Sequence, residues 1–336
     1  MTVVGPFGLS VQDQALEAEV RVGMAAVEEA LAEATKSTVP FITVAAQHLN
    51  EAGGKRFRPL LVLLASQFGD PNAPGIVPSA VVVELTHLAT LYHDDVMDDA
   101  EMRRGADTAN ARWDNSVAIL TGDFIFSRAS QILAGLGPEA VRLQAEAFER
   151  LVTGQIMETA GPGPNEDPVR HYLEVLSGKT SSLIAVSCHL GALMAGADPR
   201  VIELLKEFGE RIGLAFQLAD DILDIASDSH VSGKKPGTDL REGVPTLPVL
   251  LLKASEPDPD VPGDLRLREL LTGPIEDDAL HAEALELMRR HPALAQARED
   301  TLRYAEEART LLAALPATPA RSALEGLCDA VALRTM

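Results

Sequence analysis

Two clusters of aspartates are the residues in this chain whose types and spacing most clearly indicate chemistry. Each has two adjacent carboxylates and a third a few positions later, and the members are Asp94, Asp95, Asp98, Asp220, Asp221 and Asp224. On a helix this spacing places three like charges on one short patch of surface. Facing helices with such patches need cations, and hard oxygen ligands select magnesium or calcium over zinc. Because magnesium keeps positions open for water and phosphate oxygens, the implied substrate is a diphosphate or triphosphate.

A solvated acidic helix face is the competing interpretation of one such cluster taken alone. The flanking residues disfavour it for both. Apolar residues dominate positions 81–92, before the first cluster, and recur between 212 and 218, before the second. Both clusters therefore emerge from segments apolar enough to be buried.

Basic residues are concentrated near the same clusters. The segment Gly53–Pro59 places three cations beside a glycine pair, and glycines let backbone amides approach an anion. It indicates a diphosphate-binding turn at a helix start, although a basic turn is often only solvated. Arg103 and Arg104 follow the first cluster, where a solvent-facing ion pair is the alternative. Lys179 and residues 233–237 add further cations.

Composition limits the classes of function. The chain has 336 residues, of which 46% are hydrophobic, enough for one large helical core. Its net charge of −21 argues against nucleic acid or an anionic membrane as a default partner. Cys188 and Cys328 lack metal-ligand spacing and are interpreted as buried free thiols. No signal peptide is visible and apolar runs are interrupted before about 18 residues, so we predict a cytoplasmic chain without an integral membrane segment.

Helical periodicity dominates the elements that must position these residues. Residues 12–34 carry apolar side chains three and four positions apart, and no strand-like alternation has comparable length. Glycine- and proline-rich turns separate such runs. The acidic, proline-rich stretch near 256–264 is interpreted as a surface loop, because the helical pattern resumes at 265–271 and 279–288. The sequence predicts an all-α protein.

Taken together and in order, the motifs resemble those of the trans-isoprenyl diphosphate synthases, also called polyprenyl synthetases. The matching segments are Gly53–Pro59, His87, Asp94–Asp98, Arg103–Gly105, Lys179–Thr180, Phe216–Asp224 and Gly237–Gly243. The resemblance implies a single helical domain, 1–336, around a central apolar cavity, and a homodimer. It also implies an enzyme of the medium- or long-chain type that condenses isopentenyl diphosphate head-to-tail onto an allylic diphosphate.

The same resemblance assigns roles. Asp94, Asp98 and Asp220 would hold magnesium (Mg²⁺), supported by Asp95, Asp221 and Asp224, with the two clusters facing one cavity. Arg103, Lys179 and Lys234 would bind the allylic diphosphate. Lys55, Arg58, His87 and Arg104 would bind isopentenyl diphosphate, with Thr180 and Gln217 between the substrates. Where many family members have a lysine, this chain has Val244 and Pro245, which leaves Lys234 or Lys235 to supply that contact.

The reaction explains this set of residues. Breaking the carbon–oxygen bond of an allylic diphosphate leaves a stabilised carbocation and a highly charged leaving group, so metals and fixed cations lower the barrier. The double bond of isopentenyl diphosphate attacks the cation and the released diphosphate can remove the proton. The protein positions the substrates and excludes water.

Residues upstream of the first cluster bear on product length, because the resemblance implies that the growing tail lies alongside them. Ala89 and Thr90 are small. At about 1.5 Å per residue, continuing from Ala89 to Val82 adds on the order of 10 Å. Thr86 and residues of neighbouring helices would then stop the tail, so products beyond C15 are expected.

Two other functions compete with elongation. A class I terpene cyclase also ionises an allylic diphosphate but needs no second diphosphate site at Lys55, Arg58 and His87. A non-catalytic partner subunit could lose aspartates, and this chain keeps all of them.

Overall fold

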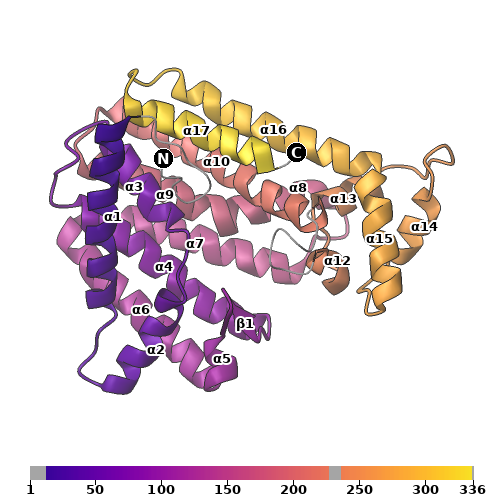
Figure 1. Ribbon diagram of the computed structural model, residues 1–336, viewed down its shortest axis with the longest axis horizontal. Coiled ribbons are helices and arrows are strands. Elements are labelled where there is room, and N and C mark those ends of the chain that lie inside the picture. Colours follow the sequence, from indigo (N-terminus) through magenta and orange to yellow (C-terminus); the bar gives the residue numbers. More distant parts are fainter. Residues whose placement is uncertain (1–12, 227–235, 335–336) are drawn as a thin grey trace. The chain divides into compact units, whose positions relative to one another are not determined.

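The computed structural model describes residues 13–226 and 236–334, and these are almost entirely helical, which confirms the all-α prediction (Figure 1). The chain groups into two compact units, each described by itself below. Unit 1 comprises residues 1–149, 182–209 and 311–327, and unit 2 comprises 150–181, 210–310 and 328–336. The prediction of one domain over 1–336 stays a prediction.

Unit 1 contains most of the N-terminal helices. Its complete helices are α1 (Gln14–Ala34), α2 (Pro40–Glu51), α3 (Phe57–Ser66), α4 (Ile76–Met97), α5 (Ala109–Arg112), α6 (Asn115–Leu136) and α9 (Ser182–Met194). Four more helices belong partly to each unit: α7 (Pro138–Ala160), α10 (Pro199–Ala226), α16 (Pro292–Leu312) and α17 (Pro319–Arg334).

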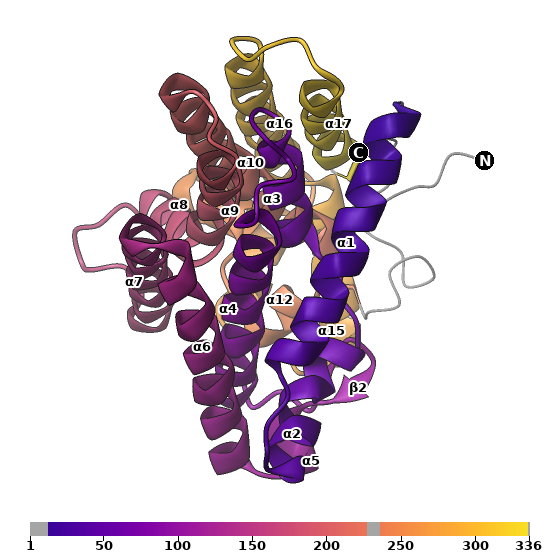
Figure 2. The same cartoon turned by 90° about the vertical axis from the view of Figure 1, so that its left-hand side faces the viewer.

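Helix α4 is the central element of unit 1. It is apolar around its whole circumference and therefore buried, with α6 on one side, α1 on the other and α3 and α9 packed against it (Figure 2). Helices α3 and α9 approach closely because Gly191 has no side chain. A Cβ there would lie 2.3 Å from the carbonyl oxygen of Val62. This packing fixes the helix that carries the first aspartate cluster.

A short hairpin follows α4 that the sequence analysis did not predict. Its strands are β1 (Met102–Arg103) and β2 (Ala106–Asp107). The two turn residues, Arg104 and Gly105, both have positive φ, 54° and 78°. A two-residue hairpin loop with positive φ at both positions matches the twist of the strands. Arg104–Gly105 was a usable turn signal, but strands this short leave no periodic pattern.

Unit 2 surrounds a second core. Its complete elements are α8 (Pro168–Leu176), the π-helical turn η2 (Ser177–Ser181), α12 (Thr238–Glu242), α13 (Leu247–Ala254), α14 (Asp264–Leu270) and α15 (Asp278–Arg290). Leu218 and Ile222 of α10 pack in this core with Leu252 and Met288. The segment carrying the second aspartate cluster is buried, as predicted.

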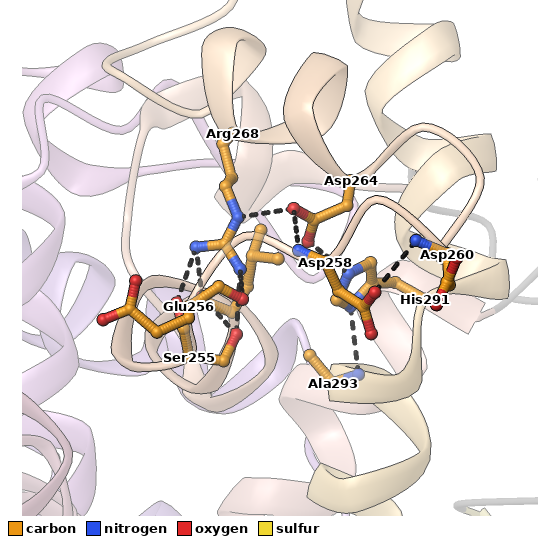
Figure 3. A network of polar contacts seen from close by, with 9 residues as sticks. Ser255, Glu256, Asp258, Asp260, Asp264, Arg268, His291 and Ala293 are labelled. Atoms are coloured by element: carbon orange, nitrogen blue, oxygen red, sulfur yellow. Dashed lines mark hydrogen bonds and ion pairs between the residues drawn. The ribbon is translucent and has the colours of Figure 1, made fainter.

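The stretch near 256–264 is a surface loop between α13 and α14, as predicted, but its last residue is buried. Asp264 accepts hydrogen bonds from Arg268 Nε (2.8 Å) and His291 Nε2 (3.0 Å), and Arg268 also donates to the Ser255 carbonyl (3.0 Å) (Figure 3). We call Ser255, Asp264, Arg268 and His291 the loop network. The backbone N–H of Ala293 donates to His291 Nδ1 (3.1 Å), so Nε2 carries the ring proton.

Helix α6 passes a length and composition test for a membrane-spanning helix, which the sequence analysis did not expect of any segment. A third of its most apolar window (33%) is buried inside the protein. Helices packed in a protein core pass the same test, and α6 packs along α4. Cys188 and Cys328 are buried and form no disulfide, as predicted.

Candidate functional site

The first aspartate cluster lies at the C-terminal end of α4. Asp95 is fully buried, Asp94 is half-buried and Asp98 is exposed at the C-cap. Arg103 Nε donates to one Asp95 carboxylate oxygen, so this ion pair is not the solvent-facing one considered as an alternative. Burial raises the pKa of Asp95 and the bond from Arg103 opposes the rise. The other oxygen, Oδ2, has no hydrogen-bond partner among the described residues.

The glycine loop, residues 53–56, lies against the hairpin. The Arg104 guanidinium donates to the Gly53 carbonyl, and a Cβ on Gly54 would lie 2.8 Å from Arg104 Nη1. The Arg104 guanidinium can therefore pack against Gly54 only because glycine has no side chain. The structure brings the predicted residues Lys55, which is exposed, and Arg104 into one part of unit 1.

Arg58 and His87 are the predicted members with the strongest electrostatic signature. Burial lowers the pKa of Arg58 to about 10, and its Nε is buried without a hydrogen-bond partner in residues 13–226 and 236–334. Burial, followed by the charges of Arg58 and Arg104, holds the pKa of His87 well below its usual range. His87 is therefore neutral at neutral pH, where it can donate a hydrogen bond without adding charge.

The residues predicted to bear on product length lie on the same helix, α4. Ala89 and Thr86 are buried and Thr90 is half-buried. The Thr86 hydroxyl donates to the Val82 carbonyl (2.9 Å) and accepts from Gln144 Nε2 of α7 (2.8 Å). Sequence reasoning missed Gln144, because a single glutamine in an amphipathic helix carries no signal of burial.

The second aspartate cluster lies in α10 of unit 2. Asp221 is buried and accepts from the Tyr172 hydroxyl and from Gln217 Nε2 (3.0 Å). Burial raises the pKa of Asp221 to about 7, and the charges of Asp220 and Asp224 add to the rise while both hydrogen bonds oppose it. Three carboxylates here repel as the sequence predicted, so a bound cation would stabilise the cluster.

Two further residues of this cluster have protein partners that the sequence did not reveal. Asp220 Oδ1 lies 2.9 Å from Arg334 Nη1, and that guanidinium lies 5.1 Å from the centroid of the Phe216 ring. Asp224 accepts from the backbone N–H groups of Thr238 (3.3 Å) and Asp239 (3.1 Å). Tyr172 and Arg334 are far from residues 220–224 in sequence, so only the fold brings them there.

Lys179 and Thr180 lie on η2, a single π-helical turn of a kind often found at functional sites. Lys179 Nζ forms an ion pair with Glu158 (2.6 Å). Thr180 Oγ1 donates to Gln217 Oε1 (3.3 Å), which joins the predicted pair Thr180 and Gln217 to Asp221. Lys234 and Lys235 lie outside the described residues. The exposed Val244 and Pro245 follow α12.

The predicted residues thus form two groups. Unit 1 holds Lys55, Arg58, His87, Arg103, Arg104 and the first cluster, and unit 2 holds Lys179, Thr180, Gln217 and the second cluster.

Comparison with known proteins decides the family. A family model described as polyprenyl synthetase matches residues 39–288. The chain belongs to the polyprenyl synthetase family. It is therefore an enzyme that transfers prenyl groups, and the resemblance found in the sequence is confirmed.

Polyprenyl synthetases of known product are close relatives. The nonaprenyl diphosphate synthase of Mycobacterium tuberculosis is 48% identical over 324 residues, covering 96% of this chain and 95% of the relative. A geranylgeranyl pyrophosphate synthase from Corynebacterium glutamicum, solved with calcium and isoprenyl diphosphate, has a TM-score of 0.86 and 46% identity, covering 96% of this chain and 98% of its own. A decaprenyl diphosphate synthase from Rhodobacter capsulatus has a TM-score of 0.84 and 33% identity, covering 96% and 99%.

The donor set of this polyprenyl synthetase fits a hard divalent cation. Carboxylate oxygens are the only charged ligands in both clusters, and Asp95 Oδ2 is buried without a hydrogen-bond partner in the described part of the chain. Within the same described residues, no three His, Cys, Asp or Glu side chains are gathered closely enough to hold a metal by themselves. Magnesium commonly binds through one or two carboxylates plus substrate phosphates, so an incomplete protein cage suits a diphosphate enzyme.

Proposed function

We propose that this protein condenses isopentenyl diphosphate head-to-tail (1'-4) onto an allylic diphosphate and makes an all-trans polyprenyl diphosphate longer than C15. One observation carries the choice of elongation: the cationic group around neutral His87, with the buried Arg58 Nε, beside the glycine loop. A terpene cyclase needs no such site for a second diphosphate.

Each residue that the sequence analysis assigned to the site has a role in this proposal. Lys55, Arg58, His87 and Arg104 bind isopentenyl diphosphate through its negative charges and hydrogen-bond acceptors. Arg103 and Lys179, with Lys234, bind the allylic diphosphate. The two aspartate clusters hold Mg²⁺ against that same diphosphate, and Thr180 and Gln217 lie between the substrates. Magnesium, when bound, would stabilise the charge that develops on the leaving diphosphate.

The residues of the chain act by position rather than by covalent chemistry. Fixed guanidinium and ammonium groups stabilise leaving-group charge without reorganising during the reaction. His87 is neutral and donates a hydrogen bond to isopentenyl diphosphate, so it adds orientation without further charge repulsion against Arg58 and Arg104. The apolar, buried flanks of both clusters keep water from the carbocation.

The proposed product length is supported by small side chains on α4 and by relatives named as nonaprenyl and decaprenyl diphosphate synthases. Ala89 has no bulk to stop a tail. Ala89→Phe should shorten the product, measured by chromatography of the dephosphorylated alcohols. An unchanged product length would defeat this part of the proposal.

The central experiment incubates purified protein with magnesium, farnesyl diphosphate and radiolabelled isopentenyl diphosphate. Elongation predicts label in a butanol-extractable product, loss of that label in EDTA, and a decrease of about a hundredfold or more in Asp94→Ala and Asp220→Ala. The exposed Asp260 of the surface loop serves as the control, since Asp260→Ala should keep full activity. Hydrocarbon release without isopentenyl diphosphate would favour the cyclase, and inactivity that a second protein relieves would favour the partner subunit.

A homodimer, a single domain and a cytoplasmic location are further parts of the proposal. Size-exclusion chromatography with light scattering tests the homodimer, since a homodimer of this 35.8 kDa chain has twice the monomer mass. A monomer with full activity would remove the dimer from the proposal.

A further inference from the structure

Arg56 lies inside the basic segment 53–58, but its side chain bonds other residues of the protein. Its neighbours Lys55 and Arg58 are predicted to bind substrate, whereas no role is predicted for Arg56. In the structure Arg56 is only 7% exposed. Its guanidinium is surrounded by acceptors of the protein itself, so it is a structural cation within a ligand-binding segment.

The contacts of Arg56 join three helices to the glycine loop. Nε and Nη2 form a two-pronged pair with Glu28 of α1, at 2.6 and 3.2 Å. Nη1 donates to Glu84 of α4 at 3.0 Å, and Nη2 donates to the Asn50 carbonyl of α2 at 3.1 Å. We call Glu28, Asn50, Arg56 and Glu84 the Arg56 network. Two-pronged arginine–carboxylate pairs fix orientation as well as charge.

The backbone at Arg56 is also unusual. It has φ 48° and ψ 38°, the left-handed conformation, at the N-cap of α3. A residue other than glycine rarely adopts this conformation, and it persists only where its surroundings enforce it. The enforcing contacts here are the four hydrogen bonds just described together with one to the Asn50 side chain (2.9 Å). The chain direction between Lys55 and Arg58 is thus set by the Arg56 side chain.

The network also determines where charge remains available. Glu84 is buried (2% exposed), and its charge acts on Arg58 as well as on Arg56. Glu84 accepts a hydrogen bond from Arg56 Nη1, and Arg58 Nε is buried without an acceptor in the described residues. Glu84 therefore attracts Arg58 as well as Arg56, but it accepts no hydrogen bond from Arg58 Nε.

We infer that Arg56 is a positioning residue for the isopentenyl diphosphate site. It fixes the glycine loop so that Lys55 and Arg58 bind the same diphosphate. This inference rests on the proposed function. Arg56 itself touches no substrate. Its loss should weaken binding of isopentenyl diphosphate selectively and leave the allylic diphosphate, assigned to other residues, little affected.

The test compares Arg56→Gln with Arg268→Gln, a matched variant of a partly buried arginine in the loop network that also bonds a buried carboxylate and backbone carbonyls (Figure 3). Arg56→Gln should raise the KM for isopentenyl diphosphate about tenfold or more, with less than about a twofold change in the KM for farnesyl diphosphate. Arg268→Gln should lower the melting temperature without changing either KM. Arg56→Lys, which keeps the charge but not the two-pronged geometry, should recover part of the lost affinity.

A milder variant protects the test against misfolding. Glu28→Gln weakens the Arg56 network at its more exposed carboxylate. It should raise the KM for isopentenyl diphosphate about threefold and leave the KM for farnesyl diphosphate unchanged. Calorimetric titration of isopentenyl diphosphate, and of inorganic diphosphate as a probe, gives a readout independent of turnover. Equal shifts in both KM values, or none, would overturn the inference. If the wild-type protein incorporates no isopentenyl diphosphate at all, the proposed function has failed instead.

Discussion

The Arg56 network and the loop network use the same arrangement in two regions with different surroundings. Each places an arginine between a buried carboxylate and at least one backbone carbonyl, and each secures the loop that precedes a helix, α3 in unit 1 and α14 in unit 2. Around Arg56 the neighbours are further cations, Arg58 and Arg104. Around Arg268 the titratable partners are Asp264 and, through it, His291. The Arg56 network pairs one arginine with two carboxylates and lies beside further cations that it does not pair. In the loop network Arg268 and His291 both bond the Asp264 carboxylate.

This difference indicates what each network is for. A cluster with excess positive charge costs stability unless an anion binds, so it is expected where substrate binds. A balanced, hydrogen-bonded cluster stabilises a loop and needs no ligand. The comparison predicts that the first network affects substrate affinity and the second affects only stability.

The largest expected effect comes from removing the buried carboxylates. Glu84→Ala should lower the free energy of unfolding by about 3–5 kcal/mol, because it removes the buried carboxylate that pairs with the buried Arg56 and leaves that cation facing Arg58. Asp264→Ala should cost less, about 1–3 kcal/mol, since Arg268 keeps the carbonyls of Leu252 and Ser255 as acceptors. Urea denaturation of both variants measures the two losses. A larger loss in Asp264→Ala would break the comparison.

The next effect is acid sensitivity of the loop network. The hydrogen bond from Arg268, followed by that from His291, lowers the pKa of Asp264 to about 2, below the unfolded value of about 3.9. A lowered carboxyl pKa adds stability that is present above the unfolded value and is lost as the pH falls from about 4 to about 2. Melting temperatures of the wild type should therefore fall toward those of Asp264→Asn across this window. Parallel curves would contradict the assignment.

A smaller effect distinguishes the two histidines. His87→Gln should raise the KM for isopentenyl diphosphate about tenfold, the worth of one good hydrogen bond, and should not change the pH profile between 6 and 8, because His87 is neutral there. His291→Gln should lower the melting temperature with both KM values unchanged. If the pH dependence of activity between 6 and 8 disappears in His87→Gln, His87 titrates during turnover and the assignment is wrong.

The smallest effects belong to the more exposed members. Glu28 is 46% exposed and Ser255 lies on the surface, so Glu28→Gln and Ser255→Ala should each lower the free energy of unfolding by about 1 kcal/mol or less. Only Glu28→Gln should change a KM. Steady-state kinetics at varied isopentenyl diphosphate separates the two, and a KM change in Ser255→Ala would remove the contrast.

The local sequence pattern was sufficient to predict most of the helices and to recognise the motifs. The periodic segment 12–34 is α1 from Gln14, the runs at 265–271 and 279–288 are α14 and α15 within one or two residues at each end, and the apolar approaches to both clusters are buried. The hairpin at 102–107 escaped prediction because its strands are too short for alternation. The motif order identified the family, since each spacing reflects a requirement of one helix or one turn.

Pairings between distant side chains were decided only by the tertiary structure. Nothing in Gly53–Pro59 distinguishes the inward Arg56 from Lys55 and Arg58, because all three are basic and the direction of each depends on where Glu28 and Glu84 lie. The same holds for Tyr172 on Asp221 and for Gln144 on Thr86. Residue types at helical spacing were sufficient to indicate the chemistry. The fold decided which charges are buried and paired, because burial and Coulomb energy depend on neighbours that the chain brings together only when it packs.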